Sequence, residues 1–287
     1  MEYRIWPRTD MASEAHRLWQ NSAAALDRLN GVKAEEQEAG AFKVFCVRID
    51  SEEGAKALGK PCGRYVTLEL PRFFTRGDEE FSAAVAQLAS LLRPLLRGSD
   101  GLSLVVGLGN EQITPDALGP AAVRQVFPTR HLKQSETKLF SSFSEVAVCT
   151  PGVLGATGIE SAAQIAAFCA SLKPARVIVV DALAGADPER LCRTVQLADS
   201  GIAPGSGVGN DRACLSEASL GVPVTAIGVP TVIDAALFGG ETSLAQLFVT
   251  PRDIDAVIRA AGRLIGYAID LALHPGLNFE ELVELLE

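Results

Sequence analysis

The segments Leu102-Ser-Leu-Val-Val-Gly-Leu-Gly-Asn110 and Val177-Ile-Val-Val-Asp-Ala-Leu-Ala184 set the architecture of this chain. Each opens with a short, nearly continuous apolar run that a glycine or an aspartate interrupts. Val146–Cys149 and Val222–Ile227 share this texture. Such runs are typical of strands buried on both faces of a parallel sheet.

Helical patterns alternate with these strands, as the crossover connections of a parallel sheet require. The expected helices are Ala117–Val126, Ile159–Leu172, Pro188–Ala198 and Asp253–Leu273. The sequence therefore predicts an α/β fold: a three-layer sandwich around a mostly parallel sheet.

The N-terminal third reads differently. Lys43–Ile49 and Arg64–Leu70 alternate apolar and polar residues with period two, which predicts an antiparallel pair of half-buried strands, and Phe81–Leu96 predicts an amphipathic helix. We expect residues 11–287 to form one domain. Its first part, 11–98, is a small β-rich extension, and its second, 99–287, is the parallel-sheet core.

Composition narrows the class of protein. The 287 residues are 48% hydrophobic and 21% charged, which excludes intrinsic disorder. A net charge of −9 disfavours non-specific binding to nucleic acid or to an anionic membrane. No apolar run reaches membrane-spanning length, and residues 1–10 lack the apolar core of a secretory signal. We expect a cytoplasmic protein with no nucleic-acid or membrane partner.

Cofactor motifs are missing. Gly107-Leu-Gly109 lacks the third glycine of a dinucleotide fingerprint, and the six cysteines contain no Cys-x-x-Cys pair. Gly205-Ser-Gly207 is not a serine nucleophile elbow, because Pro204 stands where that motif needs glycine. A glycine-rich turn is the preferred interpretation, and we expect no metal and no cofactor.

Two aspartates stand out by position. Asp181 directly follows a buried strand, and Asp116 follows Thr-Pro beyond another. Either could simply cap a helix. Chemistry in open α/β sheets gathers beyond the carboxyl ends of the strands, so the two could instead face each other. They would then share a proton, one activating a water and the other polarising a carbonyl, as in aspartic peptidases.

Several longer strings resemble the germination protease (spore protease) family, and they follow the family's order over most of the chain from about residue 100. They are Gly107–Asn110, Thr114–Pro120, Pro128–His131, Pro151–Glu160, Asp181–Ala184, Ser200–Asn210, Gly221–Asp234, Val249–Asp255 and Ala272–His274. The resemblance implies a fold related to the hydrogenase-maturation proteases and of the phosphorylase/hydrolase-like type. It places the catalytic pair on Asp116 and Asp181 and implies a homotetramer in the spore core.

The resemblance also implies a substrate class: small acid-soluble spore proteins, which the family degrades at germination. Asn110, Thr114, Gly205, Ser206 and Gly207 are then candidates for positioning the substrate.

The beginning of the chain fits the same family. Arg8-Thr-Asp-Met-Ala-Ser-Glu-Ala15 resembles the family's self-processing site, which repeats the acid–apolar–Ala–Ser–Glu pattern cut in the substrates. Residues 1–10 would be a propeptide, released by cleavage between Asp10 and Met11. A structural interpretation is compatible with this, because Asp10 is also a suitable N-cap for a helix.

Two alternatives remain open on the sequence. A metal could bridge the two aspartates, as in the hydrogenase-maturation proteases, with His131 as the nitrogen ligand available. The chain could also be a non-catalytic spore protein that keeps the fold and binds a partner. Retention of both aspartates and of a cleavable leader (the propeptide, residues 1–10) argues against that second alternative.

Overall fold

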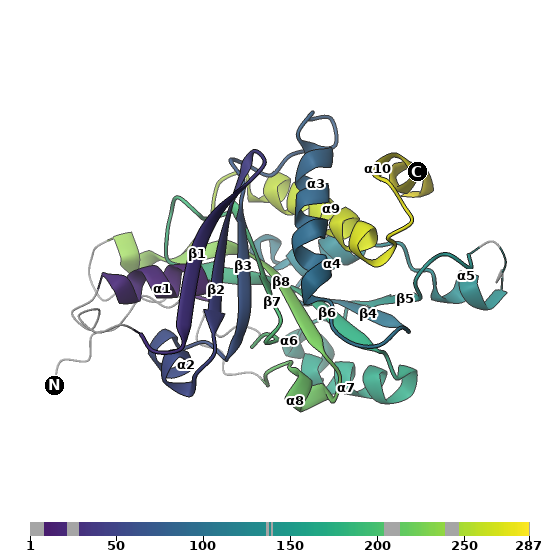
Figure 1. Cartoon of the computed structure of the whole chain (residues 1–287), viewed down its shortest axis with the longest axis horizontal. Coiled ribbons are helices and arrows are strands. Elements are labelled where there is room, and N and C mark those ends of the chain that lie inside the picture. Colours follow the sequence, from purple (N-terminus) through teal and green to yellow (C-terminus); the bar gives the residue numbers. More distant parts are fainter. Residues whose placement is uncertain are drawn as a thin grey trace.

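The computed structural model describes residues 9–21, 29–135, 138, 140–203, 213–238 and 247–286. Within them, one sheet of nine strands runs in the order β1-β2-β3-β7-β8-β6-β4-β5, with β9 paired to β8 (Figure 1). The strands are β1 (Val32–Ala39), β2 (Phe42–Ile49), β3 (Gly63–Glu69), β4 (Ser103–Gly107), β5 (Val146–Cys149), β6 (Arg176–Gly185), β7 (Thr194–Ala198), β8 (Val224–Asp234) and β9 (Phe248–Val249).

The sheet has a parallel half and an antiparallel half. Strands β8, β6, β4 and β5 are parallel, as their continuous apolar runs predict. The pairs β1–β2, β2–β3, β3–β7 and β7–β8 are antiparallel. The α/β class and the β2–β3 pair are confirmed. The sheet is mixed, however, and the expected N-terminal extension is continuous with the core sheet through β7.

Helices cover both faces of the sheet, which gives the three predicted layers. They are α1 (Ala12–Gln20), α2 (Glu52–Leu58), α3 (Phe81–Leu92), α4 (Leu118–Val123), α5 (Arg130–Ser135), α6 (Leu154–Thr157), α7 (Ser161–Leu172), α8 (Glu217–Leu220), α9 (Ile254–Leu273) and α10 (Phe279–Leu286). Figure 1 shows α3 and α9 on one side of the parallel strands and α7 on the other. No helix in the described part of the chain is both long and apolar enough to cross a membrane.

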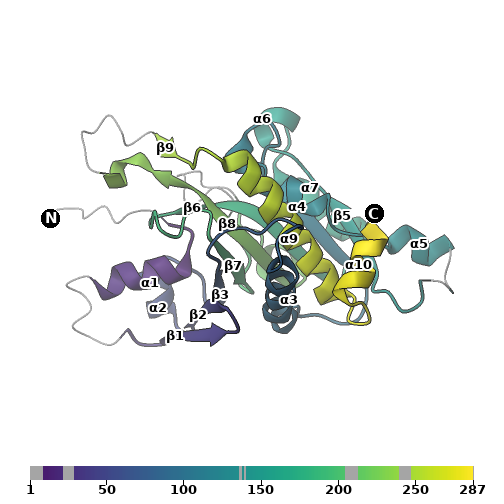
Figure 2. The ribbon, with the colours of Figure 1, turned by 90° about the horizontal axis from the view of Figure 1, so that it is seen from above.

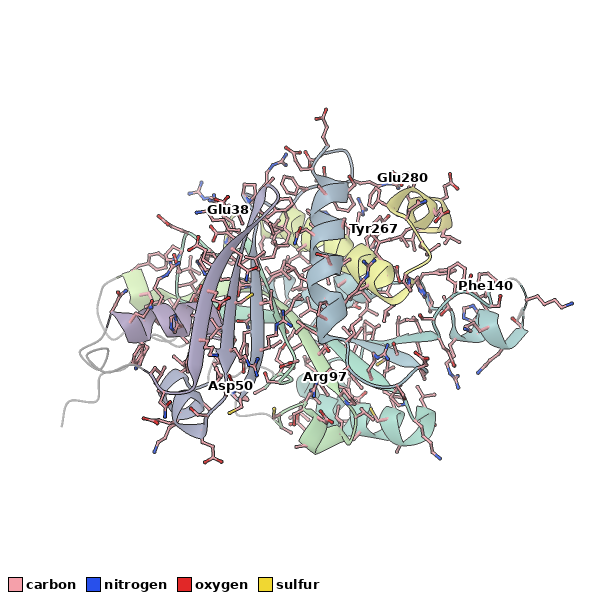
Figure 3. All side chains as sticks on the ribbon, viewed as in Figure 1. Glu38, Asp50, Arg97, Phe140, Tyr267 and Glu280 are labelled. Carbon is pink, nitrogen blue, oxygen red and sulfur yellow. The ribbon has the colours of Figure 1, made fainter. Side chains whose placement is uncertain are left out.

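The sheet has a hydrophobic core on each face, and successive residues of β6 point alternately into one core and the other. Ile178 and Val180 join the large core under α3, α4 and α9, whereas Val177 and Val179 join the core under α7. In the large core, the ring of Tyr267 lies edge-on to Phe81 and also contacts Phe279, so it links α9 to α3 and α10 (Figure 3). A third cluster, which includes Ala12, Tyr65, Ala198 and Ala226, lies between α1 and the antiparallel half.

One predicted helix is wrong. Residues 188–198 contain a turn followed by strand β7, which pairs with β3 on one side and β8 on the other. All five residues of β7 are buried. A short apolar stretch of this kind fits a buried helix or a buried strand equally well, and here pairing with two neighbours determines the outcome.

Candidate active site

A cleft of about 660 Å³ lies beyond the carboxyl end of β4, along the last residues of β6 and beside the end of β8. The segment after β4 forms one wall, and β6 supplies the base with Asp181 to Ala184. The remaining described walls come from around α6, from β8 and β9, and from Asp10 near the beginning of the chain. Its described lining comprises Asp10, Leu108, Gly109, Asn110, Ile113, Pro115, Asp116, Val153, Gly155, Ser161, Asp181, Ala182, Leu183, Ala184, Thr231, Val232, Phe248 and Thr250.

Asp116 enters the cleft from a 3₁₀ turn, η3 (Thr114–Asp116). Its Oδ2 accepts a hydrogen bond from the backbone N–H of Asn110 at 2.7 Å, so the carboxylate folds back onto the loop that follows β4. Asp116 is not a helix cap: the residue before α4 is Ala117, and α4 has no side-chain cap.

Close packing of the backbone holds this turn in place. Gly109 has φ +111°, and a Cβ there would come within 1.9 Å of the carbonyl oxygen of Asp116. A Cβ on Gly119 would come within 2.2 Å of the Leu108 carbonyl oxygen. Only glycine permits such approaches, so the two glycines fix the distance between the turn and the end of β4.

Asp181 lies on β6, at the level where the neighbouring strand ends. The last β4–β6 pair is Gly107 with Val180, so β4 no longer flanks Asp181. The side chain is buried, with Asp181 4% exposed, and its Oδ1 accepts the N–H of Ala182 at 3.0 Å. The strand continues to Gly185, so Asp181 caps no helix. Asp116 and Asp181 therefore open on one cleft.

The residues predicted to position the substrate do not all line the cleft. Asn110 lines the cleft, and its Oδ1 accepts the N–H of Gln112 at 3.0 Å. Thr114 begins η3 but is not among the lining residues. Gly205, Ser206 and Gly207 lie outside the described residues.

His131 does not reach the cleft. It is exposed on α5, which lies at the opposite end of the molecule from α1 in both ribbon views (Figure 2). Within the described residues, no group of three or more His, Cys, Asp or Glu is arranged to hold a metal ion. On the described cleft walls, the side-chain groups that could coordinate a metal ion are carboxylates, amides and hydroxyls. His131 is thus wrongly placed for the metal ligand considered above.

The segment from Asp10 to Glu14 is docked against the sheet. Asp10 pairs with Ala184 of β6: its N–H donates to the Ala184 carbonyl at 2.8 Å, and its Oδ2 accepts the Ala184 N–H at 2.9 Å. Met11 and Ala12 are fully buried. A helix does follow, but α1 begins at Ala12 with Met11 at its N-cap position, so Asp10 is not its cap. Thr9 instead accepts the Met11 N–H through its hydroxyl.

Gln196 of β7 forms hydrogen bonds to the same segment. Its Nε2 donates to the Asp10 carbonyl at 3.0 Å, and its Oε1 accepts the Ala12 N–H at 2.6 Å. Gln196 and Asp181 are both paired with Gly228 of β8 and therefore project from the same face of the sheet. One side-chain amide thus contacts the carbonyl of the Asp10–Met11 peptide bond and the N–H of the Met11–Ala12 peptide bond.

Ser13 and Glu14 are also buried. Arg190 donates to the Ser13 hydroxyl at 3.0 Å, and its guanidinium lies over the Phe45 ring. Glu14 accepts the Ala186 N–H at 2.7 Å and the Thr9 hydroxyl at 2.6 Å, while its Oε1 has no hydrogen-bond partner within the described part of the chain. Burial raises the pKa of Glu14 above its ordinary value, and these two hydrogen bonds partly oppose the rise.

Sequence reasoning missed Gln196 and Thr231. Gln196 lies in the stretch predicted to be a helix. Thr231, buried on the cleft wall, has a hydroxyl oxygen without a hydrogen-bond partner among the described groups. Its position within an apolar strand carries no signal of function.

The fold has a distant likeness among solved structures. A nickel–iron hydrogenase maturation protease, HycI from Thermococcus kodakarensis, covers 62% of this chain and 98% of its own, with 18% identity and a TM-score of 0.37. At that score the likeness supports no inference about the site.

Sequence relatives are much closer. The germination protease of Clostridium tetani is 37% identical in an alignment that covers 96% of this chain and 98% of that protein. The germination protease of Caldanaerobacter subterraneus subsp. tengcongensis is 38% identical, with coverage of 97% and 98%. That of Oceanobacillus iheyensis is 42% identical over 89% of this chain and 69% of its own length. The sequence profile of the germination protease family, peptidase family A25, matches residues 9–244. This chain therefore belongs to the germination protease family and is a peptidase.

Proposed function

We propose that this peptidase is an aspartic-type endopeptidase whose catalytic pair is Asp116 and Asp181. The observation that carries the proposal is that two carboxylates from separate segments line one cleft large enough for a peptide. Two carboxyl groups facing one water share a proton. The ionised one takes a proton from the attacking water, and the protonated one donates to the scissile carbonyl.

The cleft also suits a substrate with both polar and apolar groups. Ile113 and Phe248 line it while remaining 54% and 42% exposed, so they offer apolar contact at the rim. The Thr231 hydroxyl is available as a hydrogen-bond donor inside. Asn110 and Thr114 remain our candidates for positioning the substrate backbone, together with the loop containing Gly205, Ser206 and Gly207.

The chain is made, on this proposal, as a self-processing zymogen that degrades small acid-soluble spore proteins in the spore core. Asp10-Met-Ala-Ser-Glu14 has the acid–apolar–Ala–Ser–Glu pattern expected of those substrates. Two observations support self-processing: Asp10 lines the same cleft as the aspartates, and Gln196 holds the Asp10–Met11 peptide. With the leader in that position, a second peptide cannot occupy the same surface.

Asparagine at either aspartate tests the mechanism, because it keeps the shape and removes the ionisable group. We expect Asp116→Asn and Asp181→Asn each to lower turnover of an acid-soluble spore protein by roughly 10²–10⁴-fold. Mass spectrometry of the incubated wild-type chain should show a new N-terminus at Met11 that both variants lack. Asp234→Asn is the matched control, because Asp234 also ends a strand but is not among the residues lining the cleft.

Three results would contradict the proposal. Near-normal turnover by either variant removes that aspartate from the mechanism. A full-length chain that cuts spore proteins while keeping its leader removes the zymogen. Activity that is abolished by thorough chelation and restored by one specific cation replaces the metal-free mechanism with a metal-dependent one.

Assembly is a further part of the proposal. We propose a homotetramer, on the strength of the family resemblance. Light scattering coupled to size exclusion should then give a mass near four times the 30.3 kDa of one chain. The same mass should be found for Asp116→Asn, because the pair acts in catalysis and not in assembly. A monomer or dimer at all concentrations would contradict this proposal.

A further inference from the structure

We propose that Lys60 and the backbone N–H of Ala184 form the subsite that reads the acidic residue immediately before the cleaved bond. Gln196, on this proposal, sets the register of the peptide through the carbonyl of that bond and the Ala12 N–H that follows it. The inference rests on the proposed cleavage between Asp10 and Met11, and it treats the docked leader as the enzyme's own substrate.

Asp10 connects two cavities. It lines the cleft with Asp116 and Asp181, and it also lines a smaller cavity of about 150 Å³ on the antiparallel side of β6. The described lining of this second cavity comprises Asp10, Gly59, Lys60, Pro61, Tyr65, Leu183, Gln196, Ala198, Gly201, Ile202, Ala203, Cys214, Ala226 and Gly228. The acidic residue therefore stands where the catalytic cleft meets a cavity with different chemistry.

Charge in the second cavity is complementary. Of the described residues that line it, Asp10 is the one carboxylate and Lys60 the one cation. Lys60 follows the Gly59 cap of α2 and is partly buried. Burial lowers the pKa of Lys60, and the negative charges of Asp10 and Glu14 act in the opposite direction. An ammonium group in such a place is stabilised by a carboxylate and destabilised by a neutral side chain.

Among the described residues, the other buried charges near Asp10 have hydrogen-bond or ion-pair partners, although the Oε1 of Glu14 has none. Glu14 is not among the residues lining the Lys60 cavity, and it accepts from Ala186 and Thr9. Arg190 donates to Ser13 and lies 3.5 Å from the Glu69 carboxylate. Among the described residues that line this cavity, Lys60 is thus the cation that shares it with Asp10, and the Ala184 N–H donates to the Asp10 Oδ2.

Gln196 contributes in a different way. It contacts the Asp10 carbonyl and the Ala12 N–H, which are backbone groups that every peptide carries. It therefore positions any peptide whatever its side chains, whereas Lys60 distinguishes an acid from an amide. The two roles predict different kinetic signatures.

A double-mutant cycle on self-processing tests the subsite in the full chain. Four chains are compared by the rate at which the Met11 N-terminus appears: wild type, Asp10→Asn, Lys60→Met and the double variant. A charge-assisted contact typically corresponds to about tenfold or more in rate, so each single variant should be slower by that factor. The double variant should be no slower than Lys60→Met alone, because the partner of the acid is already missing.

Three further variants separate charge from structure. Lys56→Met, on the exposed side of α2, should process at the wild-type rate. Lys60→Arg keeps the cation, so adding Asp10→Asn should still slow its processing. Lys60→Gln removes the cation, so adding Asp10→Asn should slow its processing no further. Lys60→Gln takes the place of Lys60→Met if Lys60→Met fails to fold. Gln196→Leu should slow processing by the same factor whether it is introduced into the wild-type chain or into the Asp10→Asn variant.

Two results overturn the subsite. One is an Asp10→Asn effect of equal size in the Lys60 and Lys60→Gln backgrounds. The other is faster processing in Asp10→Asn, which would make the docked leader an inhibitory contact and not a bound substrate. Failure of the proposed function looks different: the wild-type chain would then never acquire the Met11 N-terminus, and this inference would fall with it.

Discussion

Among single residues, His274 combines deep burial with a titratable ring. It is 1% exposed at the end of α9, and its Nδ1 accepts the N–H of Ser144 at 3.2 Å. Its ring lies edge-on to Phe143. Phe143 also contacts Phe140, which is labelled near α5 in Figure 3. Burial, helped by the positive charge of Lys133, lowers the pKa of His274 to about 4. The fold therefore holds His274 neutral.

Acid should destabilise the chain through this residue. The stabilising effect of a neutral His274 is complete above the unfolded pKa of 6.5 and is lost as pH falls toward 4. A shift of that size corresponds to about 3 kcal/mol in the free energy of unfolding. Urea unfolding at fixed protein concentration should show the wild type losing about that much more than His274→Gln between pH 7 and pH 4.

The comparison with His274→Gln matters because a second buried group opposes the loss of stability at low pH. Asp270 is fully buried, and burial raises its pKa well above the ordinary value, although it accepts the Phe127 N–H. It therefore favours the folded state at low pH, and the difference between wild type and His274→Gln isolates the histidine. His131→Gln, at an exposed position, should follow the wild-type curve. If the free energy of unfolding changes with pH in parallel for the wild type and His274→Gln, then His274 is not the cause of the acid destabilisation.

At the scale of elements, the sequence predicted those whose pattern is local. Continuous apolar runs predict β4, β5 and β6, and their parallel order brings Asp181 beside the Thr-Pro-Asp turn. The resemblance to a known family assigned Asp116 and Asp181 as a pair, and the structure puts both in one cleft. That much of the candidate site was predictable.

Strand β7 was not predictable from its own residues. Thr194–Ala198 is buried on all sides because β3 and β8 flank it, and neither neighbour is near it in sequence. The misassignment of β7 hid Gln196, whose proposed role depends on its contacts with Asp10 and Ala12. Lys60 was missed for a related reason, because it lines a cavity together with Asp10 only once α2 and the segment around Asp10 have packed against the sheet.

For the whole molecule, the continuity of the sheet matters more than the division into two parts. Strand β3 pairs with β7, so residues 11–98 add three strands to the sheet that carries the cleft. The large core draws on both parts: Val66 and Leu68 of β3 share it with Val195 and Leu197 of β7 and with α9. Gln196 also connects the leader to the sheet. We therefore propose that residues 11–287 are one folding unit.

This proposal predicts that residues 99–287 do not fold alone. Without β3, strand β7 would expose an unpaired edge and the large core would lose part of its apolar cover, a combination that promotes aggregation. The full chain should lose its far-ultraviolet dichroism and its aromatic fluorescence in coincident transitions, as a cooperative unit does. Residues 11–287 should behave likewise, because only the leader is removed. A soluble fragment 99–287 with its own cooperative transition would show instead that the parallel half is an independent domain, to which the antiparallel strands were added.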